Sequence, residues 1–386
     1  MIPYGRQSIS DEDIAAVVEV LRSDWLTQGP AIPAFEDAVR AHTGAPHAIA
    51  VSNATVALHL ACLALDLGPG DRLWTSPNTF VASANCGLYC GATVDFVDID
   101  PLTLNMSVAA LETKLEQAER EGRLPRVVVP VHFAGQSCDM RAIHALARRY
   151  GFRIIEDASH AIGGSYLGEP VGGGQWSDIT VFSFHPVKII TTGEGGMCLT
   201  RDATLAARLR RLRSHGITRE PNEMEGAPQG GWYYEQVELG YNARMTDIQA
   251  ALGASQMGRL AEFIARRRVL ADRYETLLAG FPLITPGRTP DADSSWHLYV
   301  IRLTQEAPTR RAVYDALRAA GIGAQVHYIP VHLQPHYRRL GFRPGDFPHA
   351  ESYYASALSL PIFPALSDAQ QDRVVQALEQ AVRPGA

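Results

Sequence analysis

The stretch Arg153-Ile154-Ile155-Glu156-Asp157-Ala158-Ser159-His160 decides the fold, because an apolar run long enough for one buried strand ends there on polar side chains. Short β-branched runs of the same kind alternate with helical patterns over the first two thirds of the chain. This alternation predicts an α/β fold with a mostly parallel sheet between two layers of helices. In such a sheet, reactive side chains are expected outside the carboxyl ends of the strands.

Most elements of this α/β part can be placed from their patterns. The strands are expected at His47–Ser52, Ala92–Asp98, Val127–His132, Arg153–Glu156 and Ile179–Phe184. The helices are expected at Thr55–Leu65, Val108–Arg120 and Met140–Tyr150. A further apolar run, Gly196–Thr200, is expected to return beside the last strand as in a hairpin.

The rest of the chain is organised differently. Residues 1–30 are expected to form a helix, Asp11–Arg22, and an irregular arm. Residues 31–258 would form the large domain, and residues 259–386 a smaller α+β domain. An exposed loop is expected at Glu220–Gly231, helices at Met245–Leu278, Arg310–Ala320, Ala350–Leu358 and Ser367–Val382, and strands at Trp296–Leu303 and Gly323–Tyr328.

The composition is that of an ordinary soluble enzyme. The chain has 386 residues, 46% of them hydrophobic and 20% charged, with a net charge of -6. A negative net charge does not favour binding to nucleic acid or to an acidic membrane surface. The one basic run, Arg266-Arg267-Arg268, lies in a helical pattern beside Glu262 and Asp272, so we expect a solvated helix face. No uninterrupted apolar run approaches ~18 residues, and the start of the chain lacks a leader pattern, so a cytoplasmic protein is expected.

The five cysteines do not form a metal-binding pattern. Their number is odd, no Cys-x-x-Cys pair occurs, and Cys86 and Cys90 have no further ligands close in sequence. We therefore interpret them as small buried side chains in a protein of a reducing compartment, and expect no metal.

A turn between a strand and a helix has the features of an anion site. It consists of Ser52-Asn53-Ala54-Thr55, whose small residues let the backbone approach an anion closely. The first amides of the helix have no partner within it, the helix dipole favours a phosphate there, and Thr55 can add a hydroxyl donor. Taken alone, the turn is better interpreted as an ordinary helix start.

A carboxylate and an imidazole follow the buried strand quoted above. Asp157 stands at its end, where it can pair with a protonated nitrogen of a bound aromatic ring. His160 is three residues further on and can touch the same ring or an oxygen attached to it. The alternative is that Asp157 merely caps the following turn.

A lysine occurs where lysines are not placed for solubility. Ser183-Phe184-His185-Pro186-Val187-Lys188 leaves a buried strand and enters a turn rich in Gly and Thr. An amine in a partly desolvated pocket can lose its charge and form a Schiff base, and Ser183 can bind phosphate. The chain between Asp157 and Lys188 has room for one further strand, so both groups should lie at one edge of the sheet; the alternative is a surface lysine in a hairpin.

A flat aromatic side chain completes the set. Phe80 can stack on a bound ring, although an isolated aromatic residue is more often part of a core. Together, the four signals predict a site for pyridoxal 5′-phosphate.

The same arrangement resembles the fold-type I pyridoxal phosphate enzymes, and among them the DegT/StrS-type sugar aminotransferases. The resemblance extends from Ile2-Pro3-Tyr4-Gly5 to Leu360-Pro361. Besides the two segments that contain Asp157 and Lys188, the residues that carry it are Leu26-Thr27-Gln28-Gly29 and Gly240-Tyr241-Asn242-Ala243-Arg244-Met245-Thr246-Asp247-Ile248-Gln249-Ala250-Ala251.

Within that family, three segments are similar to the UDP-4-amino-4,6-dideoxy-N-acetyl-β-L-altrosamine transaminases of pseudaminic acid biosynthesis. They are Phe80-Val81-Ala82-Ser83-Ala84-Asn85, Arg213-Ser214-His215-Gly216-Ile217 and Val326-His327-Tyr328-Ile329-Pro330-Val331-His332. This similarity implies a UDP-linked 2-acetamido-2,6-dideoxy-4-keto-hexose as acceptor and L-glutamate as amino donor. It assigns no role to His332 or His336.

The resemblance also implies roles for individual residues. Lys188 matches the lysine that binds the cofactor covalently, and Asp157 matches the partner of the ring nitrogen. The other positions that match cofactor contacts are Ala54, Thr55, Phe80, His160 and Ser183, with Asn242 reaching the phosphate in the neighbouring subunit of a homodimer. The positions that match sugar-nucleotide contacts are Tyr4, Asp24, Trp25, Leu26, Thr27, Gln325, Val326, His327 and Tyr328.

The sequence departs from the family pattern in the first two of the following features, and the third is a common variation within the family. Asn53-Ala54-Thr55 replaces the commoner Ser-Gly-Thr, Ile189-Ile190 follows Lys188 where a polar residue or Pro is frequent, and His160 stands where many relatives have Gln. Neither of the first two changes removes a group that the reaction needs.

Three other functions are compatible with the fold. A sugar 3-dehydratase would carry His in place of Lys188, so the lysine argues against it. A non-catalytic regulatory relative would be expected to lose Lys188 or Asp157. An aminotransferase that acts at C3, or on a dTDP- or GDP-linked sugar, stays open.

Overall fold

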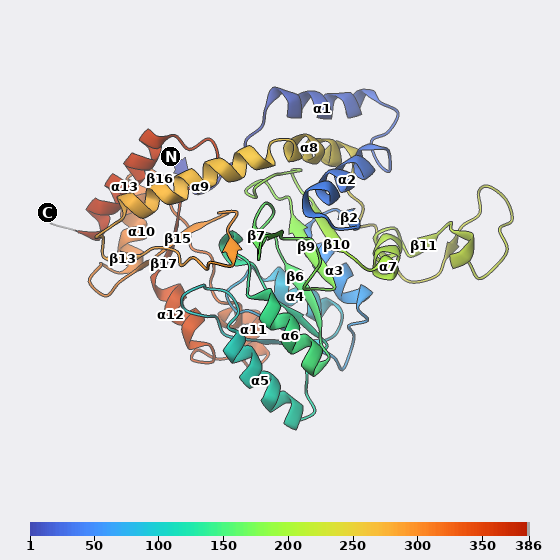
Figure 1. Ribbon diagram of the computed structural model, residues 1–386, viewed down its shortest axis with the longest axis horizontal. Helices are drawn as coiled ribbons and strands as arrows, with labels where there is room; N and C mark the ends of the chain where they lie inside the picture. Colours follow the sequence, from blue (N-terminus) through green and yellow to red (C-terminus); the bar gives the residue numbers. More distant parts are fainter. Residues whose placement is uncertain (384–386) are drawn as a thin grey trace.

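The computed structural model describes residues 1–383, and a seven-stranded sheet lies at its centre (Figure 1). In spatial order the strands are β2 (His47–Val51), β10 (Gly196–Thr200), β9 (Ile179–Ser183), β6 (Arg153–Asp157), β5 (Val127–Val129), β3 (Arg72–Thr75) and β4 (Thr93–Phe96). β10 is antiparallel to both neighbours, and all other pairs are parallel. The predicted α/β fold with a mostly parallel sheet is confirmed.

Helices cover both faces of the sheet because alternate side chains of each strand point to opposite sides. In β2, Ile49 and Val51 belong to one apolar layer, and Ala48 and Ala50 belong to the other. The first layer includes α3 (Ala54–Ala64), α4 (Ala82–Tyr89) and α7 (Ala203–Arg213). The second includes α2 (Ala31–Thr43), α5 (Val108–Arg120), α6 (Met140–Tyr150) and α8 (Asp247–Met257).

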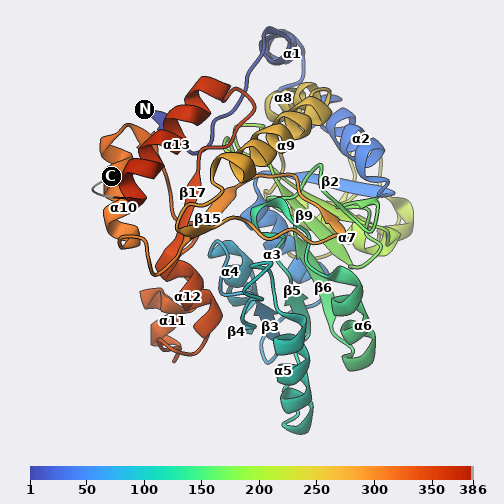
Figure 2. The ribbon, with the colours of Figure 1, turned by 60° about the vertical axis from the view of Figure 1, so that its left-hand side comes forward.

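A smaller unit lies beyond α9 (Leu260–Leu277), as Figure 2 shows. Its antiparallel sheet contains β13 (Leu283–Ile284), β15 (Tyr299–Leu303) and β17 (Ala357–Leu360), and its helices are α10 (Arg310–Ala319), α12 (Pro348–Ser356) and α13 (Asp368–Val382). β1 (Ile2–Pro3) pairs with β16 (Ile322–Gly323), so the first residues of the chain join this unit. The division into domains at residues 30 and 258 stays a prediction.

Short elements complete the fold. They are β7 (Ser165–Tyr166), β8 (Glu169–Pro170), β11 (Ile217–Thr218), β12 (Glu235–Gln236), β14 (Ala292–Asp293), α11 (Pro335–Arg339) and the 3-10 helices η1 (Phe133–Gly135), η2 (Pro221–Glu223) and η3 (Val331–Leu333). None of the helices within residues 1–383 combines the length and the apolar character that crossing a membrane requires.

The N-terminal helix occupies its predicted residues as α1 (Asp11–Arg22). It packs on α8 through Asp13, which is buried. Its carboxylate accepts hydrogen bonds from Ser255 and Gln256, both at 2.6 Å, and pairs with Arg259. A polar anchor of this kind helps to fix a helix that has no other fully buried residue to the body of the protein.

Some predicted elements are wrong in extent or type. The expected helix Met245–Leu278 is two helices that separate at Gly258 and Arg259, because α8 packs against α1 and α2 while α9 turns toward the smaller unit. The expected strand Gly323–Tyr328 reduces to the end of β16 and a single bridge from Gln325 to Ser359. The last residues of the expected helix Ala350–Leu358 belong to β17 instead, paired with β15.

The expectation for the basic run is wrong at its middle residue. Arg266 and Arg268 form ion pairs with Asp368 and Asp293 at the surface, but Arg267 is only 1% exposed. Its Nη1 donates to the carbonyl oxygens of Trp296 (3.0 Å), His297 (3.3 Å) and Ile362 (3.0 Å). Consecutive residues of a helix point in different directions, so one of three adjacent arginines faces inward.

The cysteines are free thiols, as expected for a protein without disulfides. Four of them, Cys62, Cys86, Cys138 and Cys198, are buried, and Cys90 is partly exposed. The interpretation as buried small side chains is confirmed for these four.

Candidate functional site

The turn before α3 forms a cradle at the end of β2. Asn53 caps the helix by accepting the Val56 amide at 2.9 Å. The amides of Ala54 and Thr55 are the first two of the helix, so they have no acceptor inside it. The start of β10 lies directly against this turn, since a Cβ on Gly196 would come within 2.5–2.6 Å of the Asn53 and Ala54 backbone. Only glycine fits there.

Ser183 lies beside the same turn. In the β9–β10 register it is the partner of Gly196, the residue that contacts Asn53 and Ala54. The three predicted phosphate-binding residues Ala54, Thr55 and Ser183 therefore come from two strand ends that the sheet brings together. Free amides at a helix N-terminus together with hydroxyl groups suit a phosphate.

Asp157 ends β6 and is 5% exposed. Its Oδ2 accepts the Ser83 hydroxyl at 2.6 Å, and its Oδ1 accepts the Ser159 amide at 3.1 Å. Asp157 thus does cap the following turn, but its other oxygen is held by a residue of α4. Ser83 lies only three residues after Phe80, but no pattern in the sequence marks it as a partner of Asp157.

Lys188 follows β9 and is partly buried near Asp157. Burial lowers the pKa of its amine to about 8, although the negative charge of Asp157 acts in the opposite direction and raises the pKa. An amine with this pKa is partly uncharged at neutral pH, so it can act as a nucleophile or accept a proton. The alternative of an ordinary surface lysine does not describe this environment.

Aromatic side chains lie next to these groups. Tyr328 Oη lies 3.2 Å from His160 Nε2, and the rings of Tyr328 and Phe80 are 6.2 Å apart. Phe80 is 58% exposed, so it does not belong to the core and its face is free for a bound ring. His327 packs against Tyr4 at 5.0 Å between ring centroids. Burial and then the charge of Lys188 lower the pKa values of His160 and His327, the latter to about 3.

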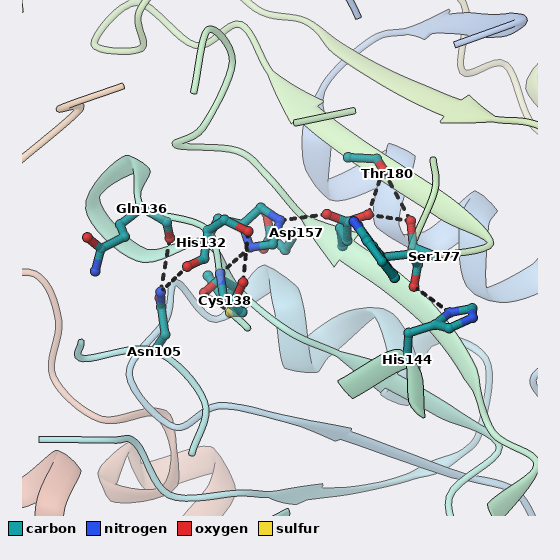
Figure 3. Close-up of polar contacts among 12 residues, drawn as sticks. Asn105, His132, Gln136, Cys138, His144, Asp157, Ser177 and Thr180 are labelled. Atoms are coloured by element: carbon teal, nitrogen blue, oxygen red, sulfur yellow. Dashed lines mark hydrogen bonds and ion pairs between the residues drawn. The ribbon is translucent and has the colours of Figure 1, made fainter. Parts of the chain in front are cut away.

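A second polar network supports the strand that carries Asp157, and Figure 3 shows it around His132. His132 Nε2 lies 2.7 Å from Glu156, the residue before Asp157, and His132 Nδ1 accepts the Cys138 amide at 3.2 Å. Glu156 also accepts hydrogen bonds from Ser177 and Thr180. Because Glu156 and Asp157 point to opposite faces of the strand, this network fixes the strand end without entering the site. No pattern in the sequence predicts this network.

Other predicted site residues lie on exposed segments. Asp24 to Thr27 are exposed, and Leu26 and Thr27 are tied to the start of α8. Asn242 is exposed and bridges to Ser214, and within residues 1–383 no hydrogen bond links it to the groups around Lys188. Gln325 is exposed and Val326 partly buried. One chain therefore assembles the groups around Lys188 and leaves Asn242 outside.

These groups fit pyridoxal 5′-phosphate. The cradle of Ala54, Thr55 and Ser183 suits its phosphate, the buried carboxylate of Asp157 suits its ring nitrogen, and the amine of Lys188 suits its aldehyde. The fold and this site together define an aminotransferase that uses this cofactor.

The comparisons with known proteins agree. The chain belongs to the DegT/DnrJ/EryC1/StrS aminotransferase family, whose model matches residues 7–379. Its cofactor is pyridoxal 5′-phosphate: among similar solved structures is a sugar aminotransferase from Streptococcus pneumoniae described in PLP and PMP forms, with 30% identity and TM-scores of 0.88 and 0.89 over 98–99% of both chains.

Three further relatives are similar over nearly their whole length. The spore coat polysaccharide biosynthesis protein SpsC of Bacillus subtilis is 42% identical over 99% of this chain and 97% of its own. The UDP-4-amino-4-deoxy-L-arabinose–oxoglutarate aminotransferase of Shewanella sediminis is 37% identical over 99% and 98%. Helicobacter pylori PseC, described as an aminotransferase involved in the biosynthesis of pseudoaminic acid, is 30% identical with a TM-score of 0.90 over 99% of both chains.

Ser83 offers a test of the Asp157 environment. Ser83→Ala removes one of the two hydrogen bonds to that carboxylate, and a hydrogen bond to a charged group contributes about 1.5–3 kcal/mol. We expect kcat to fall about tenfold or more in a folded protein that still binds the cofactor. Ser107→Ala, which removes the hydroxyl cap of α5, is the control and should leave kcat unchanged. Equal activity of both variants would show that Ser83 does not act on Asp157.

Proposed function

We propose that this protein transfers the amino group of L-glutamate to C4 of a UDP-linked 2-acetamido-2,6-dideoxy-4-keto-hexose, giving a UDP-4-amino-4,6-dideoxy sugar. The observation that carries the transfer is the pair of Lys188 and Asp157, a partly buried amine with a lowered pKa beside a buried carboxylate. The choice of substrate is supported by the likeness to PseC and to the aminotransferase of Shewanella sediminis, which is named for a UDP-linked 4-amino sugar and oxoglutarate.

Each residue then has a defined task. When bound, the cofactor supplies an electron-poor ring that stabilises negative charge on the carbon next to the transferred nitrogen. Lys188 Nζ takes the proton from Cα of glutamate in the first stage and delivers a proton to C4 of the sugar in the second. Asp157 holds a proton at the ring nitrogen, while Phe80 covers one face of the ring and Ala54, Thr55 and Ser183 bind the phosphate.

The substrate site would extend from this centre over the exposed segments. His327 lies close enough to Lys188 for the charge of the amine to lower its pKa, and Tyr4 and Tyr328 pack against His327. These three side chains would contact the sugar. The remaining predicted contacts are Asp24, Trp25, Leu26, Thr27, Gln325 and Val326. All of these except the partly buried Val326 are exposed, which leaves them free to bind the nucleotide. The five free thiols support a reducing, cytoplasmic setting.

We further propose a homodimer with shared active sites. The segment that contains β11 and β12 extends away from the body of the chain, as Figure 1 shows in yellow-green. It exposes Trp232 (75%), Tyr234 (52%), Leu239 (79%) and Tyr241 (39%), and apolar side chains gathered on one exposed segment favour a protein interface. Asn242 directly follows and would reach the cofactor phosphate of the partner subunit.

The test of the reaction is a product analysis. The purified protein, loaded with cofactor, is incubated with L-glutamate and UDP-linked 4-keto-hexoses, and the amino sugar is identified by mass and NMR. We expect nitrogen at C4 and formation of 2-oxoglutarate. A product aminated at C3, or a preference for dTDP- or GDP-linked sugars, would instead support the alternative acceptors.

Complementation tests the shared site. Lys188→Ala and Asn242→Asp are each expected to be inactive, the second because its carboxylate repels the phosphate. In a mixed dimer one site receives both changes and the other receives neither, so activity should return to about one intact site in four when subunits pair at random. No recovery under conditions of subunit exchange would show that each site is built by a single chain.

A further inference from the structure

The imidazole of His160 is held by three segments that are far apart in the sequence. Its Nδ1 accepts the backbone amide of Ala134 at 3.3 Å, and its Nε2 lies 3.2 Å from Tyr328 Oη. Its carbonyl oxygen accepts the Ser295 hydroxyl at 2.7 Å. His297 packs on the ring with 4.4 Å between centroids, and the His297 backbone is itself held by the buried Arg267.

These contacts define where the hydrogen of His160 lies. A backbone amide can only donate, so Nδ1 carries no hydrogen and accepts through its lone pair. Burial and the charge of Lys188 lower the pKa of His160 well below its ordinary value, so the imidazole is neutral. A neutral imidazole without a hydrogen at Nδ1 has it at Nε2, and Nε2 therefore donates to Tyr328 Oη.

The consequence concerns the hydroxyl of Tyr328. Burial raises the pKa of Tyr328 well above its ordinary value, so the hydroxyl keeps its hydrogen. Since Oη already accepts from His160, this hydrogen must point to another group. Within residues 1–383 the hydroxyl has no other hydrogen-bond partner, and it lies among Phe80, His160 and the charge of Asp157. The hydrogen is thus free to point into the site.

We propose that Tyr328 donates this hydrogen bond to the carbonyl oxygen of the sugar substrate, and that His160 is the residue that positions it. The inference rests on the proposed function, because it needs a keto-sugar in the site. A donor at that oxygen stabilises the negative charge that develops there when an amine attacks the carbonyl carbon. The first stage also ends in a ketone, 2-oxoglutarate, but glutamate enters the site without a carbonyl oxygen on the reacting carbon. We assign Tyr328 to the oxygen of the sugar, so the two stages have to be measured separately.

Tyr328→Phe separates the two stages. Each is followed by the change in cofactor absorbance, with glutamate alone for the first and with the keto-sugar alone, added to the aminated enzyme, for the second. We expect an unchanged first stage and a second stage slower by about 10²-fold. Tyr150→Phe, which removes a buried hydroxyl of α6 that has no hydrogen-bond partner, is the control. Equal slowing of both stages, or of neither, would overturn the assignment.

Two variants test the role of His160. In His160→Gln, the new side-chain amide can still accept from the Ala134 amide and donate to Tyr328. The rate of the second stage should therefore stay within about tenfold of wild type. His160→Ala offers no donor, and its loss should match that of Tyr328→Phe. A glutamine variant as slow as the alanine variant would show that the hydrogen bond is not what matters.

The tautomer can be measured without any reaction. Long-range 1H–15N correlation spectra of the cofactor-free protein should show His160 neutral with its hydrogen on Nε2, and a hydrogen on Nδ1 would overturn the inference. A wild-type protein that reacts with glutamate but with no keto-sugar would contradict the proposed function, while leaving this measurement unaffected.

Discussion

Replacement of Lys188 with Ala is expected to lower turnover by about 10³-fold or more, because one side chain supplies both the amine that binds the cofactor and the proton acceptor. The change removes a partly buried amine and should leave the fold intact. Lys188→Arg should fail as well, since a guanidinium stays protonated and is not a nucleophile at neutral pH. Circular dichroism of both variants would check folding, and steady-state kinetics with glutamate would measure the loss.

The chain offers a matched control because it contains only two lysines. The other is Lys114, which forms an ion pair with Asp95 at 2.8 Å and donates to the Phe96 carbonyl oxygen. Lys114→Ala should retain activity. Borohydride reduction followed by peptide mapping should place the cofactor on Lys188 and none on Lys114. More than a few per cent of activity in Lys188→Ala would contradict the assignment.

Asp157→Asn is expected to retain the cofactor and to lose about 10²-fold or more of its activity. The amide is nearly the same size but carries no charge, so it cannot hold a proton at the ring nitrogen, and the ring loses much of its capacity to stabilise a carbanion. The asparagine would also turn its NH2 group toward either Ser83 or Ser159, both of which donate to Asp157, so one of these two hydrogen bonds would be lost. The absorbance spectrum reports cofactor binding, and stopped-flow mixing with glutamate reports the first stage.

The control for this substitution lies at the other end of the same strands. Asp178 accepts the Ile154 amide at 2.8 Å and pairs with Arg153 at 2.9 Å. Asp178→Asn removes a charge at an ion pair that is partly exposed, where the contribution to stability is about 0–1 kcal/mol, and should not affect turnover. If Asp157→Asn turned over at a near wild-type rate, Asp157 would only cap the turn at Ser159 and would have no role in the reaction.

Several elements could be predicted because their information is local. α5 and α6 occupy their predicted residues, since amphipathic spacing and caps such as Ser107 and Asp139 are encoded within a few positions. The strand that ends at Asp157 was recognisable from its apolar run. By contrast, the break at Gly258 was not, because the apolar pattern continues across it and only the packing of α8 on α1 and α2 requires the change of direction.

The sequence by itself determined the α/β class and most of the strands and helices that alternate along the chain. It also predicted that Lys188 and Asp157 lie at one edge of a parallel sheet. Only the tertiary structure decided which side chains meet there. Ser83 reaches Asp157 across 74 positions and Tyr328 reaches His160 across 168, and Arg267 is buried although its neighbours are not. Such contacts depend on how elements that are distant in the sequence pack together, and this packing cannot be predicted from periodicity or local composition.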